Sequence, residues 1–148
     1  MKYKLKDLKF DTIEYSSSYV TNLGKVLNMK ESIEFQTPKV KIVDLDDEYL
    51  TLKILPSEAC RVFFLKIIEF EEKIKEEFKD IVQLFDGDIF KVKIKNKNFK
   101  IYLNGTLFNV YHLKRDMEII CLVSIYKLWI NAYNIVSYNL KVDEIVIK

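Results

Sequence analysis

A row of lysines on alternate positions is the most suggestive chemical feature of the chain. The row comprises Lys91, Lys93, Lys95 and Lys97, with aliphatic residues at positions 92 and 94. In a strand this alternation places the lysines on one face and the aliphatic side chains on the other. Ammonium groups that repeat every ~6.8 Å approach the phosphate spacing of an extended nucleic-acid strand. The row therefore predicts phosphate contacts, with a solvated sheet edge kept basic against aggregation as the alternative.

Aromatic side chains near these lysines add a second part of the pattern. Lys100 and Tyr102 share a parity on the strand that follows, so a ring is expected beside the lysines. Positive charge along the backbone combined with rings for base stacking is typical of proteins that bind single strands. The predicted phosphate ligands are Lys91, Lys93, Lys95, Lys97 and Lys100, and the predicted stacking residues are Tyr102, Tyr111 and Trp129. Lys39 and Lys41 are expected to extend the groove, while a core position remains the alternative for Trp129 and Tyr111.

Other chemistries find less support in the sequence. His112 is the single histidine, and nothing at suitable spacing joins it for metal binding or hydrolysis. The carboxylates at 44–48 lack the glycine and terminal glutamate of a calcium loop. Three glycines are too few for a phosphate cradle. We therefore expect no cofactor, no metal and no enzymatic activity.

Composition bounds the class of protein. The chain has 148 residues, of which 49% are hydrophobic and 31% charged, as expected of a single globular domain spanning 1–148. Cys60 and Cys121 cannot form a disulfide framework and are expected to pack in the core of a protein from a reducing, cytoplasmic setting. The net charge of +2 is uninformative, but 89–115 carries seven basic residues and no acidic one. No apolar run reaches the ~18 residues of a membrane span, so no membrane association is expected.

The elements that position these residues are predicted to be strands, one helix, then strands. Alternating patterns predict early strands over 3–10, 28–35, 40–43 and 49–54. Ser57 is a natural N-cap for a helix that extends to about Phe78–Lys79. Apolar residues at spacings of three and four give this helix one apolar stripe. They are Phe63 or Phe64, Ile67, Phe70, Ile74 and Phe78.

The second half is expected to contain two hairpins and two long strands. Ile89–Ile94 and Phe99–Leu103 flank Lys95–Asn98 and predict a hairpin with a basic tip. Asn104-Gly105 predicts a second, tight hairpin turn. Glu118–Trp129 and Ile135–Ile147 predict the last strands. Segregated elements of this kind indicate a mainly β (α+β) fold, an antiparallel oligonucleotide-binding (OB)-like barrel or sheet with extra strands and one long amphipathic helix.

Three stretches give the chain a resemblance to a known family. They are Ile33–Val40, which contains Gln36-Thr37-Pro38, the helix block Phe63–Ile74, and the terminal block Leu113–Lys148 with Ile125–Ile130 and Tyr138–Val142. In these the chain resembles the OB-fold single-stranded-DNA-binding proteins of large nucleocytoplasmic DNA viruses, distant relatives of the T7 phage type. The resemblance implies DNA replication, recombination or repair in a viral or virus-derived setting. Gly and Trp, expected near Ser137 and Tyr138, are absent, and the chain ends on a strand instead of an acidic tail.

The leading hypothesis is a non-enzymatic protein that binds single-stranded DNA, with RNA as the alternative ligand, and that can form a homo-oligomer. The alternative is a protein-interaction or virion structural module on the same fold. In that case the acidic helix face and the exposed strand edges are the contacts, and nucleic acid is not bound.

Overall fold

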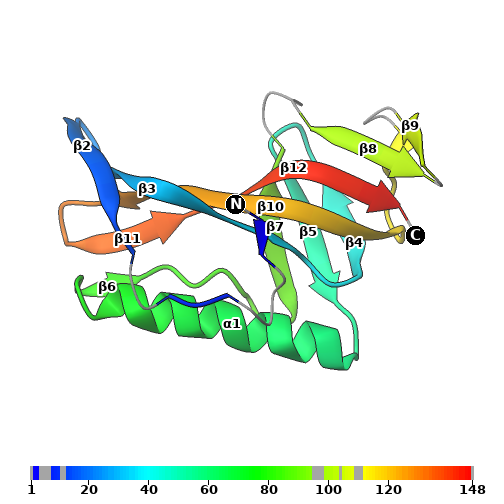
Figure 1. Cartoon of the computed structure of the whole chain (residues 1–148), viewed down its shortest axis with the longest axis horizontal. Helices are drawn as coiled ribbons and strands as arrows, with labels where there is room; N and C mark the ends of the chain where they lie inside the picture. The colour runs from blue at the N-terminus through cyan, green and yellow to red at the C-terminus, as the bar shows by residue number, and fades with distance from the viewer. Residues whose placement is uncertain are drawn as a thin grey trace.

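The computed structural model describes residues 2–3, 8–10, 13–94, 99–103, 105–108 and 112–147. Three of the predicted site residues, Lys95, Lys97 and Tyr111, lie outside this set. Strands dominate, and one α-helix, α1 (Glu58–Lys75), lies across the described sheet (Figure 1). The strands are β1 (Lys2–Tyr3), β2 (Tyr15–Thr21), β3 (Gly24–Gln36), β4 (Val40–Leu45), β5 (Tyr49–Ile54), β6 (Asp80–Ile81), β7 (Ile89–Lys93), β8 (Lys100–Leu103), β9 (Thr106–Phe108), β10 (Glu118–Ile130), β11 (Ile135–Tyr138) and β12 (Leu140–Ile147).

Five strands form a partly closed ring. β4 pairs with β5, β5 with β7, β7 with β12, β12 with β10, and β10 again with β4. Only the β7–β12 pair is parallel. When these five strands are numbered 1 to 5 by their order in the chain, their order around the ring is 1-2-3-5-4. This is a five-stranded barrel of the OB kind, with additional strands attached to it. The predicted fold class is confirmed. Closure is narrow, because β10–β4 and β12–β7 each contribute two residue pairs.

The helix covers the inner side of the sheet, as its pattern predicts. The Ser57 hydroxyl accepts a hydrogen bond from the Cys60 amide at 3.1 Å and so caps the first turn. The predicted stripe is buried at Phe63, Ile67, Phe70 and Ile74. The helix ends at Lys75, before the expected Phe78. Glu71 is also buried, and accepts hydrogen bonds from the Tyr138 hydroxyl at 2.5 Å and the Leu84 amide at 2.8 Å, which ties α1 to β11.

Residues 89–103 do not form the predicted basic hairpin. β7 and β8 both run parallel to β12, with Val92 opposite Leu140 and Lys100 opposite Glu144. They lie one after the other along the same neighbour and do not pair with each other. The prediction was wrong because β7 and β8 run in the same direction, both parallel to β12, where a hairpin needs opposite directions. The predicted second hairpin is confirmed by the antiparallel pairing of Leu103 with Thr106, and Asn104 of its predicted turn lies outside the described residues.

The N-terminal region differs from the expected strand over 3–10. β1 is short, and Leu8 and Phe10 are buried outside any strand. They pack on the helix, where the Phe10 and Phe70 rings lie 5.4 Å apart and Lys66 donates to the Leu8 carbonyl at 2.8 Å. The sequence pattern did not predict β2, because its run of serines has no apolar alternation.

β10 is the central strand of the molecule. It pairs with β3, β4, β11 and β12, and it was predicted to within one residue. The predicted last strand is split into β11 and β12 at Asn139. Thr37 of the Gln-Thr-Pro stretch is buried, and its hydroxyl accepts a hydrogen bond from the Cys121 amide at 3.0 Å. This stretch therefore has a structural role in holding β10 where β3 ends.

Candidate nucleic-acid interface

Side chains along β7 alternate between the core and the outer side of the ring. Phe90 and Val92 are buried, whereas Lys91 is exposed and Lys93 is half-buried. The predicted separation of lysines from apolar residues is therefore confirmed for the described half of the row. On the neighbouring β5, Tyr49 is the partner of Lys93. Paired residues project to the same side of a sheet, so Tyr49 stands among these lysines.

Three residues of β10 share this outer side. Tyr126, Lys127 and Trp129 are half-buried, and none belongs to the apolar core that contains Leu128 and Ile130. Regular alternation is lost here because the pairing of β10 with β3 shifts register between Ile125 and Lys127. The shift allows Tyr126 and Lys127, although adjacent in sequence, to gather on one surface.

Lysines lie over the faces of these rings. The Lys127 ammonium is 5.2 Å from the ring centroids of both Tyr126 and Trp129. Lys93 is 5.9 Å from the Trp129 ring, and Lys141 of β12 is 5.6 Å from the Tyr126 ring. At the far side Lys91 is 5.9 Å from the Tyr49 ring. Distances of about 6 Å or less are those of cation–π contacts. We call this set of seven residues the aromatic–lysine surface, made up of Tyr49, Lys91, Lys93, Tyr126, Lys127, Trp129 and Lys141.

The lysines of this surface are largely uncompensated. Among the described residues, none of the four forms an ion pair with a carboxylate. Two of them lie near a carboxylate. Hydrogen bonds from the amides of Tyr49 and Glu48 lower the pKa of Asp46, and the charge of Lys91 adds to this effect. The charge of Lys141 also acts to lower the pKa of Asp143, against the larger effect of burial, which raises it. Lys93 and Lys127 are therefore the two lysines of the surface whose charge is least offset by a carboxylate.

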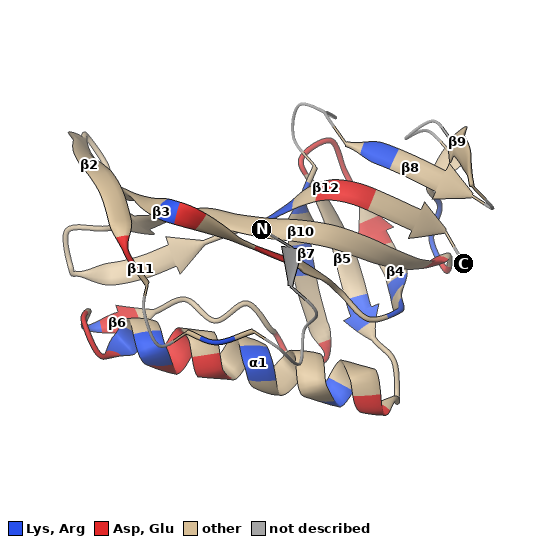
Figure 2. Cartoon of the chain, in the orientation of Figure 1, with Lys and Arg blue, Asp and Glu red and all other residues tan. Residues whose placement is uncertain are grey.

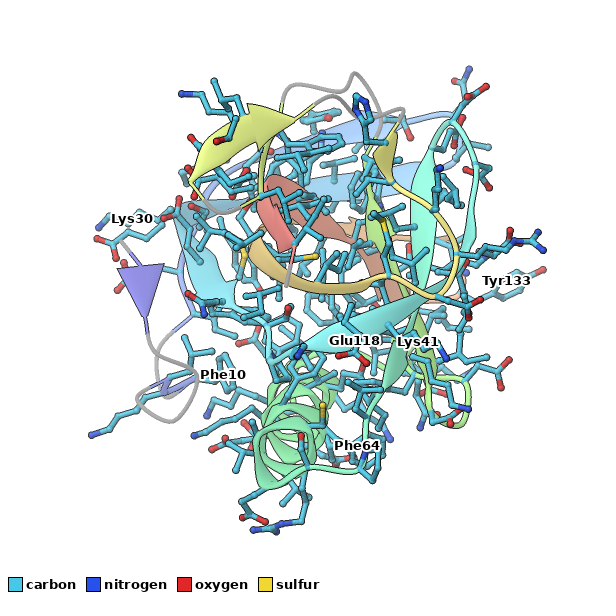
Figure 3. All side chains as sticks on the ribbon, turned by 90° about the vertical axis from the view of Figure 1, so that its right-hand side faces the viewer. Phe10, Lys30, Lys41, Phe64, Glu118 and Tyr133 are labelled. Carbon is cyan, nitrogen blue, oxygen red and sulfur yellow. The ribbon has the colours of Figure 1, made fainter. Side chains whose placement is uncertain are left out.

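Lys39 and Lys41 lie elsewhere and are ion-paired. Lys39 contacts Glu118 at 3.1 Å, and Lys41 contacts Asp116 at 3.5 Å. Lys39 immediately precedes β4 and Lys41 is its second residue, where β4 meets β10; Figure 3 shows Lys41 beside Glu118. Lys53 of β5 is paired with Asp88 in the same way, at 3.6 Å. Because each of these lysines already has a carboxylate partner, the structure gives little support to Lys39 and Lys41 as phosphate ligands.

Lys100 and Tyr102 are separated from the aromatic–lysine surface by acidic residues. Lys100 lies opposite Glu144 of β12, and the neighbouring Asp143 is half-buried. Burial raises the pKa of Asp143, despite a hydrogen bond from Ser124 and the charge of Lys141. Figure 2 shows this acidic band on β12 next to the basic band on β8. The expected position of Tyr102 beside the lysine row was wrong because β8 does not return along β7.

Sequence reasoning missed Tyr49, Lys127 and Lys141, and left Tyr126 undecided between core and surface. The three missed residues come from three different strands of the ring, β5, β10 and β12, so no single stretch of sequence brings them together. The signal that was available is the Tyr-Lys-Leu-Trp order at 126–129, in which two rings and a lysine surround one core residue. Trp129 is the predicted stacking residue that the structure places among lysines.

The other candidate chemistries gain no support within the described residues. Across these residues no group of three or more His, Cys, Asp or Glu side chains is placed to hold a metal ion. Asp46, in the acidic turn, accepts hydrogen bonds from the amides of Glu48 and Tyr49 at 2.7 and 2.8 Å, a structural use of its carboxylate. Both cysteines are buried, as predicted, and burial raises the pKa of Cys121 to about 12. In the described part of the chain, no helix combines the length and apolar character needed to span a membrane.

No protein-family model matches the chain. Over 118 residues, or 80% of its length, the chain is 25% identical to the septation ring formation regulator EzrA from two strains of Staphylococcus epidermidis. The match spans 20% of each regulator. An identity this low over a fifth of the relative does not place the chain in that family.

Proposed function

We propose that this chain is a binding protein for single-stranded nucleic acid, with DNA as the leading ligand, and that the aromatic–lysine surface is its contact site. The observation that carries the proposal is the gathering of Tyr126 and Trp129 with Lys93 and Lys127 on the outer side of an OB-like ring. The lysines would bind the phosphate groups, and the bases would stack on the aromatic rings. The resemblance noted above supports a role in viral or virus-derived DNA replication or repair.

The geometry favours a single strand over a duplex. The cations and rings are interleaved, so a ligand must offer phosphates and unpaired base faces at the same place. Base–aromatic stacking contributes about 1–3 kcal/mol per base and tolerates any sequence. A duplex keeps its base faces stacked internally and would use the lysines alone. We therefore expect binding with weak sequence preference and a clear preference for single strands.

Trp129 provides a direct test because it is the only tryptophan of the chain. Titration with an oligothymidylate should quench its fluorescence, while anisotropy of labelled single-stranded DNA, single-stranded RNA and duplex DNA reports affinity at two salt concentrations. We expect tighter binding of the single strands and weakening with salt, because counterions are released from each contacted phosphate. If the Kd values for all of the single-stranded ligands exceed about 100 μM at low salt, the proposal is wrong.

A further inference from the structure

β2 leaves one edge of the sheet unpaired. Its residues pair with β3 from Ser17 opposite Asn28 to Thr21 opposite Gly24, and within the described part of the chain no strand lies against its other edge. Figure 1 shows β2 at one extremity of the molecule. Antiparallel bonding alternates along a strand. Counting from the two-residue turn after Thr21, the N–H and C=O groups of Ser18 and Val20 point to the free edge.

From Ser17 to Thr21, beyond the register shift between Tyr15 and Ser17, this edge lacks the usual protection. β2 reads Tyr-Ser-Ser-Ser-Tyr-Val-Thr and contains no charged residue and no proline. All of its side chains except that of Tyr15 are exposed. Natural proteins protect exposed edges with lysine, proline or inward-pointing charges, because unpaired backbone groups are a template for another strand. An uncharged, β-branched and aromatic edge is therefore suited to pairing.

Exposed apolar side chains gather at the same end. Val20 is 81% exposed, Leu23 89% and Tyr133 75%. Gly24 brings the turn that carries Leu23 against the start of the β10–β11 turn, since an added Cβ at Gly24 would lie 2.1 Å from the Ile130 carbonyl oxygen. Figure 3 shows Tyr133 projecting from the body of the protein. Large apolar side chains grouped at one end of a protein mark an interaction surface.

The occupant that fits this edge best is a second copy of the chain. Two β2 strands in antiparallel register bring no like charges together. The same arrangement sets the end with Glu14 beside the partner's turn, and because Glu14 already pairs with Lys30 at 3.2 Å, it brings no uncompensated carboxylate to the contact. A nucleic-acid strand would find no cation on β2 itself. We propose that β2 pairs with its own copy to form a symmetric dimer with one continuous sheet, a contact of a kind that uses identical patches on both subunits.

The dimer would leave the aromatic–lysine surface open. Tyr19 lies opposite Val26, which in turn lies opposite Trp129, so Tyr19 faces the outer side of the sheet. A two-fold axis normal to the sheet keeps the outer sides of both copies on the same side. The interface and the proposed binding surface are therefore distinct, and either can fail without the other.

Sedimentation velocity of the full chain, without nucleic acid, tests the proposal. Between about 1 and about 100 μM we expect a concentration-dependent shift from monomer to dimer. Ser18→Pro removes an outward N–H and should reduce the dimer fraction at least tenfold, whereas Ser18→Ala keeps the backbone and should dimerise normally. Val20→Lys places a charge on the edge and should have the same effect as the proline, with Val20→Thr as its control. Hydrogen exchange of the Ser18 and Val20 amides should slow as the concentration rises.

Two results would overturn the β2 interface. One is a wild-type chain that stays monomeric over the whole range. The other is a dimer that persists in both Ser18→Pro and Val20→Lys while circular dichroism shows the native fold. If Ser18→Pro fails to fold, Val20→Lys decides alone, because an exposed side chain at this position leaves the pairing with β3 intact.

Discussion

The two groups of lysines on the ring differ in what surrounds them. On the β4–β5 side, Lys39, Lys41 and Lys53 each contact a carboxylate, at 3.1 to 3.6 Å. On the aromatic–lysine surface, Lys93 and Lys127 contact aromatic rings instead. In an ion pair the carboxylate offsets the charge of the lysine. An aromatic ring carries no net charge, so a cation–π contact leaves most of the lysine charge available to an incoming anion. The positions of the lysines in the sequence do not reveal this difference, and it determines which of them can bind phosphate.

The largest expected effect comes from reversing charge on the free side. Lys93→Glu with Lys127→Glu should weaken binding of single-stranded DNA by at least about tenfold and lower the slope of log K against log salt by about 1 for each lost contact. Fluorescence anisotropy over a salt series measures both quantities.

The matched control reverses two ion-paired lysines. Lys39→Glu with Lys41→Glu changes the net charge by the same amount but removes cations that Glu118 and Asp116 already neutralise. We expect the affinity of this variant to fall much less than that of the first. Equal losses in the two variants would show that total charge, and not the aromatic–lysine surface, controls binding.

A smaller effect is expected from removing one ring. Trp129→Ala deletes a stacking platform, which should cost about 1–3 kcal/mol of binding free energy, or about 5- to 150-fold in Kd. Unlike the lysine changes, it should leave the salt slope nearly unchanged, because no phosphate contact is lost. Trp129→Phe is the control and should retain most of the affinity. A steeper or shallower salt slope in Trp129→Ala would contradict the assignment of phosphate contacts to the lysines and base stacking to Trp129.

The smallest effect is expected on β8. Lys100→Glu should reduce affinity by no more than about two- to threefold, since Glu144 and Asp143 stand between Lys100 and the aromatic–lysine surface and salt screens exposed charges over a Debye length of ~8 Å. The same titration provides the measurement. A loss as large as that of the Lys93 and Lys127 double variant would extend the binding path onto β8.

Local signals in the sequence were sufficient for many of the elements. The Ser57 cap, the helix stripe as far as Ile74 and the hairpin of β8 with β9 depend on neighbouring residues, and all three are confirmed. The relation of β7 to β8 depends on their shared partner β12, 44 to 48 residues later in the chain, so the sequence around 95–98 was misread as a reversal. A parallel neighbour leaves no trace in the local pattern.

The candidate site was predictable only in part for the same reason. Alternation correctly separated Lys91 and Lys93 from the core. Tyr49 and Lys141 join them through ring closure, which brings β5 and β12 to either side of β7. Tyr126 and Lys127 join through the register shift in β10, where strict alternation fails. Each missed residue therefore depends on a long-range pairing or an irregularity that a single stretch of sequence does not encode.

The collinear arrangement of β7 and β8 has a consequence for how this protein can change. β7 and β8 pair separately with the same edge of β12, so the junction between Ile94 and Phe99 connects two strands that run in the same direction. Closing a longer loop costs little, since doubling loop length adds only about 0.6 kcal/mol. This junction is therefore a natural place to graft extra residues, whether by evolution or by design, without disturbing the pairing of the barrel.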